Sequence, residues 1–251
     1  MAAATQPLPP ISLRRVLYDV GQSYRHRFGR VAIAALFVFG IAAVIGTVVD
    51  RAVTETEPYP ILYIFALAGA AMSQVGTTFY AGLLDKVVGE FELGEEPEPI
   101  MQVLRTLPYG SLIVADILIT VFSIIGALFL VIPGLIIFTL FAITGPVINI
   151  EQVGALRGMR RSAELVRPHF WPVLFVVALP LFVEHQVIHA VHAWVFDHEI
   201  YEVFLVEGIT GMIIGSFVGL VEVNIAYALV ARDRVQSAAA AAAAAGSSVR
   251  P

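Results

Sequence analysis

The stretch EHQVIHAVH, residues 184–192, places a glutamate and three histidines inside an otherwise apolar sequence. On a helix the histidines are spaced i, i+4 and i+7, so they share one face: His185, His189 and His192. Two histidines at i, i+4 can chelate a metal ion, with Asp197 or Glu207 as a third ligand. The same imidazoles could instead relay protons. Because the spacing His-Glu-x-x-His is absent, we expect the amphipathic end of a helix and keep the metal set as an alternative.

A second group of polar residues lies within long apolar stretches, all at a similar depth near their cytoplasmic ends: Gln74, Asp116, Asn149, Glu222 and Asn224. If these side chains face one another, they form a polar cavity open to the cytoplasm that could bind a headgroup, an ion or a small solute. Alternatively, they make unrelated hydrogen bonds between helices. The cavity requires Asp116 and Glu222 to lie on the same side of the bundle.

A basic run could attract anionic phospholipid, at about 1 kcal/mol for each charge near the surface: Arg157, Arg160, Arg161 and Arg167. The same arginines would also fix the orientation of the chain in a membrane. Nucleic-acid binding is not expected, because these arginines adjoin apolar stretches and the net charge is -5.

The composition predicts the class of fold that holds these residues in place. The chain is 58% hydrophobic and 14% charged, with a mean hydropathy of +0.83. A soluble domain carries nearly twice that share of charge, at about 25%, so we predict a multi-pass membrane protein with an all-α fold. The absence of cysteine excludes disulfides and thiolate ligands. No motif for a cofactor is recognisable.

Six apolar stretches are long enough to cross about 30 Å of hydrocarbon, and we predict a span at each: 31–50, 61–84, 111–131, 133–150, 171–194 and 207–231. The dipeptide Pro133-Gly134 predicts a tight turn between the third and fourth spans, and Pro146 predicts a kink in the fourth. Residues 1–235 then form a single membrane domain. The low-complexity segment 236–251 is expected to be either a disordered tail or an alanine extension of the last helix.

Basic residues predict the orientation. With the N-terminus placed in the cytoplasm, Arg51 alone among the 15 lysines and arginines falls in an outside loop. Both termini are therefore predicted to be cytoplasmic, in a cell membrane. Three inside segments have apolar residues at helical spacing and are predicted to lie on the inner leaflet, around 13–24, 100–107 and 153–166. Residues 85–99 are predicted to form an acidic inside loop.

The stretch 131–171 combines an apolar Pro-Gly hairpin, a proline late in the next span and the sequence ALRGMRRS. It resembles the membrane domain of some glycerophosphoryl diester phosphodiesterases and of related six-span prokaryotic proteins. The matching positions include Pro133, Gly134, Pro146, Glu151, Arg161 and Ser162. The resemblance implies membrane residence and a link to lipids. It does not imply phosphodiester hydrolysis, because the soluble catalytic domain of that family has no counterpart here.

The sequence thus predicts a non-enzymatic integral membrane protein, without a cofactor, that interacts with lipid headgroups or membrane partners. The first alternative is a small transporter or permease that uses the polar cavity near the cytoplasmic side. The second is an intramembrane enzyme with a histidine-bound metal. Small residues recur every four positions in the last span and allow close helix approach, either within one chain or between two copies: Gly211, Gly215 and Gly219.

Overall fold

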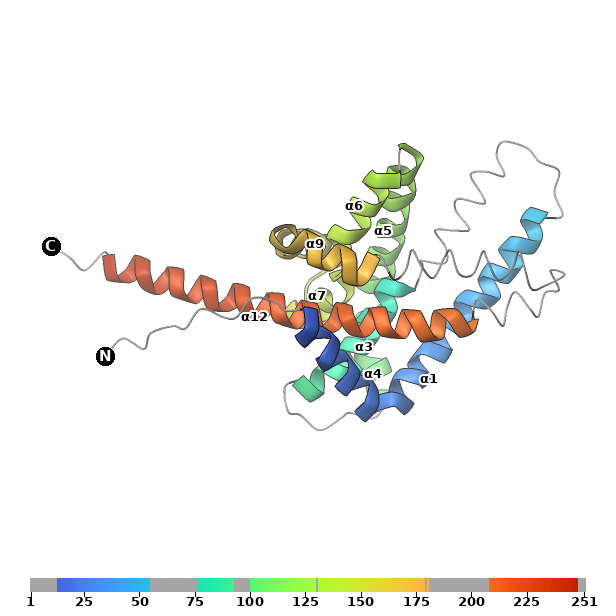
Figure 1. Cartoon of the computed structure of the whole chain (residues 1–251), viewed down its shortest axis with the longest axis horizontal. Helices are drawn as coiled ribbons and strands as arrows, with labels where there is room; N and C mark the ends of the chain where they lie inside the picture. The colour runs from blue at the N-terminus through green and yellow to red at the C-terminus, as the bar shows by residue number, and fades with distance from the viewer. Residues whose placement is uncertain are drawn as a thin grey trace.

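The computed structural model describes residues 13–54, 76–92, 100–129, 131–178, 180 and 208–247. Within these ranges all regular elements are helical and no strand occurs, which confirms the all-α class. The helices gather around the first half of α12 (Ser216–Ser247), whose C-terminal part extends away from the others (Figure 1). Helix α12 packs against α1, α3, α7 and α8.

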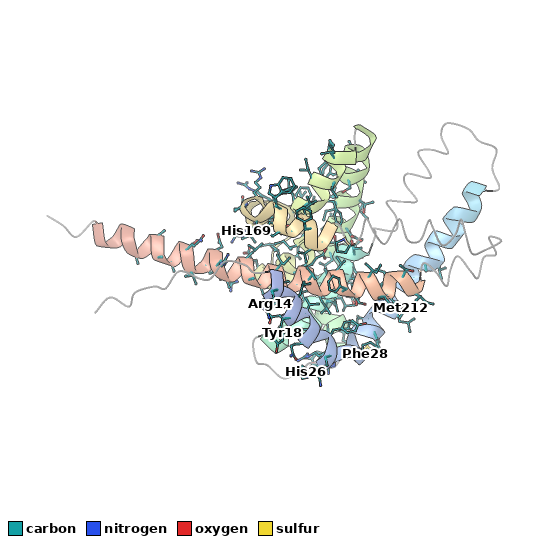
Figure 2. The ribbon with its side chains drawn as sticks, viewed as in Figure 1. Arg14, Tyr18, His26, Phe28, His169 and Met212 are labelled. Carbon is teal, nitrogen blue, oxygen red and sulfur yellow. The ribbon has the colours of Figure 1, made fainter. Side chains whose placement is uncertain are left out.

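Helix α1 (Leu13–Thr54) joins the first predicted surface helix to the first predicted span. The two parts meet at Arg27, whose backbone angles, φ -124° and ψ 23°, are not helical. Figure 1 shows the resulting bend, and Figure 2 places Phe28 beside it. Val16 and Val20 of the first part are buried, as their helical spacing predicts. This face therefore packs against protein rather than lying free on a lipid surface.

Helix α3 (Thr77–Glu92) corrects one prediction. Residues 85–99 were expected to form a loop, but the helix continues through Glu92. Asp85 is consequently on the same helical face as Thr78, two turns earlier, and both side chains are buried. Helix α4 (Ile100–Thr106) follows and corresponds to the second predicted surface helix.

Helices α5 (Tyr109–Phe129) and α6 (Val131–Phe141) form the predicted hairpin. The prediction that Pro133-Gly134 makes its turn is wrong, because both residues lie in the first turn of α6. Proline is tolerated there, since the first amides of a helix have no partner within it. Gly134 instead allows close approach: a Cβ on Gly126 of α5 would come within 2.9 Å of the Gly134 backbone.

A break separates α6 from α7 (Thr144–Glu151), as the proline in this span predicts. Pro146 lies in the first turn of α7 and has no N–H to donate to Ala142, four residues earlier. The Thr144 hydroxyl donates to the Phe141 carbonyl oxygen at 2.6 Å, which satisfies one acceptor at the end of α6. The prediction of a kink in the fourth span is therefore confirmed.

Helix α8 (Ala155–Val166) begins after Gln152, which ends α7 in the left-handed conformation with φ 51°. Met159 and Val166 of its predicted apolar stripe are buried against protein, whereas Leu156 is 70% exposed. Helix α8 packs against α5, α6, α7 and α12. Short segments then follow: η1 (Arg167–His169), α9 (Phe170–Val173) and two π-helices, η2 (Leu174–Ala178) and η3 (Gly211–Gly215).

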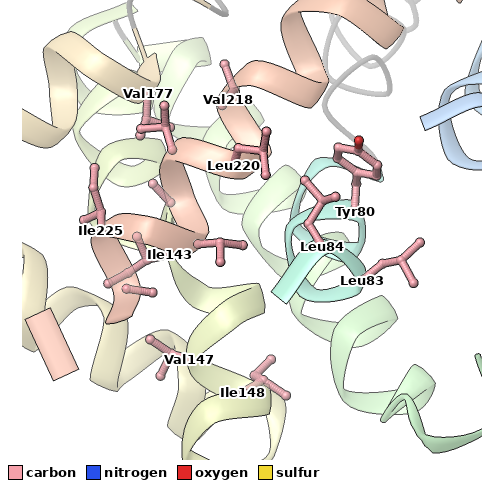
Figure 3. Close-up of a cluster of buried hydrophobic side chains, with 14 of the residues drawn as sticks. Tyr80, Leu83, Leu84, Ile143, Val147, Ile148, Val177, Val218, Leu220 and Ile225 are labelled. Atoms are coloured by element: carbon pink, nitrogen blue, oxygen red, sulfur yellow. The ribbon is translucent and has the colours of Figure 1, made fainter. Parts of the chain in front are cut away.

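Buried aliphatic side chains surround α12 (Figure 3). Val218 and Leu220 of α12 meet Tyr80 and Leu84 of α3 and Ile143, which precedes α7, in this cluster. For residues 236–251, the structure shows helix as far as Ser247, which is the second of the two predicted alternatives.

Two stretches of described helix are long and apolar enough to cross a membrane, Ile132–Glu151 and Gly208–Ala242, and they correspond to the fourth and sixth predicted spans. Tyr109–Ser123, which overlaps the third, is a shorter apolar helix. The predicted spans 61–84 and 171–194 fall largely outside the described residues. Judged by length and apolar composition, the described helices do not support all six predicted spans.

Candidate functional site

Four of the five predicted cavity residues lie inside the bundle and are buried: Asp116, Asn149, Glu222 and Asn224. The fifth, Gln74, lies outside the described residues. The four do not all meet. Asp116 and Glu222 come together, Asn149 belongs to a neighbouring polar group, and Asn224 donates to the Leu220 carbonyl oxygen of its own helix at 2.8 Å.

Asp116 of α5 caps the beginning of α3. Its carboxylate accepts hydrogen bonds from the backbone N–H of Gly76 and, at 3.3 Å, from that of Thr78. These amides are among the donors that a helix start leaves without a partner, and the positive end of the helix dipole favours a carboxylate there. Gly76 has a φ of 103°, a conformation that residues with a side chain rarely adopt.

Glu222 of α12 is 2% exposed, and the charge of Asp116 acts on it. This proximity is the arrangement that the cavity hypothesis requires. Two carboxyl groups inside a bundle do not readily carry two negative charges, because burial and mutual repulsion both oppose ionisation. Since Asp116 receives two N–H donors, Glu222 is the better candidate to hold a proton.

Asn149 of α7 connects its helix to α3. Its side-chain amide donates to the Gly82 carbonyl oxygen at 2.6 Å, and its own carbonyl oxygen has no hydrogen-bond partner among the described residues. The helices approach this closely because of Gly145, where a Cβ would collide with the Thr78 carbonyl oxygen.

Asp85 is a functional candidate that sequence reasoning missed. It is 4% exposed, hydrogen-bonds to Tyr227 of α12 and lies within hydrogen-bonding reach of Asn149. Its Oδ1 atom has no hydrogen-bond partner among the described residues. Spacing could have revealed it, because Asp85 follows Thr78 by seven residues and thus lies on the same helical face.

Polar contacts recur along the buried side of α12 at intervals of five or six residues. Three are hydrogen bonds: Ser216 with Tyr80 at 3.0 Å, Tyr227 with Asp85, and Asp233 with Arg161 at 2.5 Å. The fourth is the electrostatic interaction of Glu222 with Asp116. Helical rise separates successive contacts by about 8 to 9 Å. The series runs from the interior to Asp233, whose side chain is 37% exposed.

Arg161 of α8 is the centre of an ionic cluster that joins α7, α8 and α12. Its guanidinium donates to Glu151 at 3.0 and 3.1 Å and to Asp233 at 2.5 Å, and Glu164 lies 3.8 Å away. Burial of Arg161 disfavours its charge, but the hydrogen bonds to Asp233 and Glu151 outweigh this and raise its pKa. Arg161 is therefore already engaged by carboxylates and is poorly placed to bind lipid.

The motif residues Glu151, Arg161 and Ser162 all make contacts between helices. Ser162 donates to the Leu140 carbonyl oxygen of α6 at 2.9 Å, in addition to the Arg161 contacts described above. In this chain, these positions hold α8 against its neighbours.

The other three predicted lipid-binding arginines are exposed: Arg157, Arg160 and Arg167. Arg160 pairs with Glu164 at 3.0 Å on the same helix. Arg157 and Arg167 form no ion pair within the described part of the chain. They are the two arginines of the set best placed to meet an external anion.

The glycines of the last span pack within a single chain. Gly211 and Gly215 lie against the Phe39 ring of α1, and Gly219 lies against Tyr80 and Leu84 of α3. Side chains at these positions would meet those groups within the same chain. The first of the two predicted alternatives, packing within one chain, is the one observed.

The histidine face formed by His185, His189 and His192 lies outside the described residues. Among the residues that are described, no group of three or more His, Cys, Asp or Glu side chains is placed to hold a metal ion. Comparisons with protein families, curated proteins and solved structures find no match to this chain. The resemblance to the phosphodiesterase membrane domain therefore stays a prediction.

Proposed function

We propose that this chain is a non-enzymatic integral membrane protein with six spans and cytoplasmic termini, and that it binds anionic lipid headgroups at the inner leaflet of the cell membrane. The observation that most directly supports a place in the membrane is the orientation of α5. Its exposed face is apolar, whereas its buried face includes two polar residues, Asp116 and Thr120, beside apolar ones such as Leu112. Ile113, Ile117, Val121 and Ile125 are 42–52% exposed, whereas Asp116 and Thr120 are buried. Water would favour the reverse arrangement, and a hydrocarbon solvent favours this one.

The second part of α1 supports the same interpretation. Its outward row consists of large apolar side chains: Ile33, Leu36, Phe37, Ile41 and Val44, all at least 50% exposed. Small and aliphatic residues such as Ala34, Ala35 and Val38 face the bundle. A soluble protein rarely exposes so continuous an apolar surface.

The lipid-binding site that we propose surrounds α8. Arg157 and Arg167 are exposed there, and Trp171 and Phe175 follow with 65% and 56% exposure. Aromatic side chains are enriched where a membrane meets water. Two cations beside an aromatic pair match a headgroup phosphate above an acyl chain.

Native mass spectrometry of the gently extracted full chain, titrated with phosphatidylglycerol or phosphatidylcholine, tests this function. We expect retention of phosphatidylglycerol, and a loss in affinity of about fivefold for each of Arg157→Gln and Arg167→Gln. Arg160→Gln is the matched control and should have a smaller effect, because Arg160 already pairs with Glu164. Equal retention of the two lipids by the unmodified chain would refute the proposal.

The electrostatic interaction between the buried carboxyl groups of Asp116 and Glu222 favours one second candidate, a small transporter or permease with a polar cavity near the cytoplasmic side. That function requires Glu222 to be reached by water. The chain has no cysteine, so Glu222→Cys introduces a single thiol. If the chain is a transporter, this thiol should react with a membrane-impermeant thiol reagent applied from the cytoplasmic side. Ala226→Cys, one turn further on the same helix and 0% exposed, is the control. Equal, negligible labelling at both positions would exclude the cavity.

A further inference from the structure

Asp85 occupies an unusual environment for a carboxyl group. It is 4% exposed, and Tyr227 supplies a hydrogen bond. The other carboxyl oxygen, Oδ1, has no hydrogen-bond partner among the described residues. An ionised carboxylate accepts several hydrogen bonds when it is stable inside a protein. With one oxygen unpaired and the side chain buried, the ionised form of Asp85 is disfavoured.

Asn149 also has a side-chain oxygen without a hydrogen-bond partner among the described residues. Its amide nitrogen donates to the Gly82 carbonyl oxygen at 2.6 Å, which fixes the orientation of the side chain. Reversing the amide would bring two carbonyl oxygens together. The Asn149 Oδ1 atom is therefore an acceptor, and it is buried without a donor among the described residues. Asp85 lies within hydrogen-bonding reach of this side chain.

We propose that Asp85 is a proton-binding site, in which the protonated carboxyl group donates its O–H to Oδ1 of Asn149. A single proton then satisfies both unpaired oxygens. The proton is taken from water on the cytoplasmic side and bonds to Oδ1 of Asp85. It returns to water when the site is ionised, and no other bond changes. This site goes beyond the proposed lipid binding and does not depend on it.

Burial favours a proton on Asp85 and outweighs the polar groups around it, which act in the opposite sense. Tyr227 of α12 and Asn149 of α7 hydrogen-bond to it, and Lys86 on its own helix is the cation that acts on it. Helices α1, α4 and α5, which also pack against α3, contribute no charged group to Asp85. Hard metal ions take about six oxygen ligands, whereas two unpaired oxygens are present here.

The position of Asp85 gives the site a role. Tyr227, the partner of Asp85, is six residues from the partly exposed Asp233 and five residues from Glu222. Helical rise therefore places Tyr227 about 8 to 9 Å along α12 from each of them. Asp85 thus lies between the cytoplasmic ionic cluster around Arg161 and the deep carboxyl pair of Asp116 and Glu222. It is placed to be the first interior acceptor for protons from the cytoplasm.

Infrared difference spectroscopy on the full chain in lipid nanodiscs tests the proposal. A protonated carboxyl group has a carbonyl stretch that ionised carboxylates lack. We expect a band in the unmodified protein near neutral pH that disappears on titration to alkaline pH and is missing in Asp85→Asn. Asn149→Leu should keep the band but shift it, because the proton loses its acceptor. Glu164→Gln, an exposed carboxylate, should leave the spectrum unchanged.

Two results would overturn the proposal. One is identical carboxyl spectra for the unmodified protein and Asp85→Asn from about pH 5 to about pH 9, a range wide enough to include strongly shifted carboxyl groups. The other is a band that responds to sodium at constant pH, which would make Asp85 a cation ligand. Asn149→Leu retains the carboxyl group and keeps the test decisive if Asp85→Asn does not fold.

Discussion

Helices α5 and α8 pack against each other and are amphipathic in opposite senses. On α5, large apolar side chains such as Ile117 face outward, and Asp116 faces the bundle. On α8, arginines face outward, and Met159 and Val166 face the bundle. A helix directs toward its solvent the side chains that the solvent accommodates best. The comparison supports the membrane setting that we propose, with hydrocarbon around α5 and water or headgroups around α8.

The largest expected effect comes from an outward charge. Val121→Arg at the centre of the third predicted span should cost about 3 kcal/mol in membrane insertion. Leu156→Arg is the matched change on α8, at a residue that is 70% exposed, and should change stability by no more than about 0.5 kcal/mol. For both variants, membrane insertion is measured as the fraction of the protein that stays in the membrane after alkaline extraction. Equal tolerance of the two would remove the contrast between α5 and α8.

The inward face of α5 should be nearly as sensitive. Asp116→Ala leaves the buried amides of Gly76 and Thr78 without their acceptor, at about 1 to 3 kcal/mol for each unpaired group. Ser123→Ala is the control on the same helix, because the Ser123 hydroxyl is buried without a hydrogen-bond partner among the described residues. Denaturant titration in detergent should show a clear loss for the first variant and little or none for the second. Similar losses would mean that Asp116 does not cap α3.

Arg161→Gln tests what holds α8 in place. It removes contacts to Glu151 and Asp233 from a side chain that is 24% exposed, and we expect a loss of about 1 to 2 kcal/mol after partial screening by solvent. Arg160→Gln removes one exposed pair within α8, which is worth about 0.3 to 0.5 kcal/mol. Thermal unfolding in detergent ranks the two, and the opposite order would contradict the assignment of Arg161 as the connection between helices.

The smallest effect is a pH dependence at the end of α8. Burial, and then the charge of Arg232, lower the pKa of His169. The unfolded chain therefore binds a proton more readily than the folded chain, so stability should fall as the pH decreases through about 6.5. We expect the melting temperature of His169→Gln to fall less than that of the unmodified protein when the pH is lowered through this value. An unchanged pH profile in the variant would exclude His169 as its source.

Local patterns predicted much of the fold. The helical spacing of Val16 and Val20, the break before Pro146 and the all-α class are properties of short segments, and they are present in the structure. The Pro133-Gly134 turn failed because proline is also compatible with the first turn of a helix. The loop predicted from residue 85 onward failed because acidic composition does not end a helix whose opposite face is buried.

The candidate site was only partly predictable. Depth along the predicted spans placed Asp116 and Glu222 at one level, and the structure brings them together. The same reasoning grouped Asn224 with them, although it bonds to its own helix. Asp85 was missed, because its burial depends on α7 and α12, which approach from distant parts of the sequence.

The sequence by itself determined where the apolar segments lie, which class of fold they form and which stretches are basic. These properties follow from side-chain transfer energies summed over neighbouring residues. Only the tertiary structure decided which polar groups meet. Close packing at Gly145 brings Asn149 to Gly82, and the rotation of α12 presents Tyr227 to Asp85. Such contacts depend on the rotation and separation of helices, which the packing of all the side chains between them determines together.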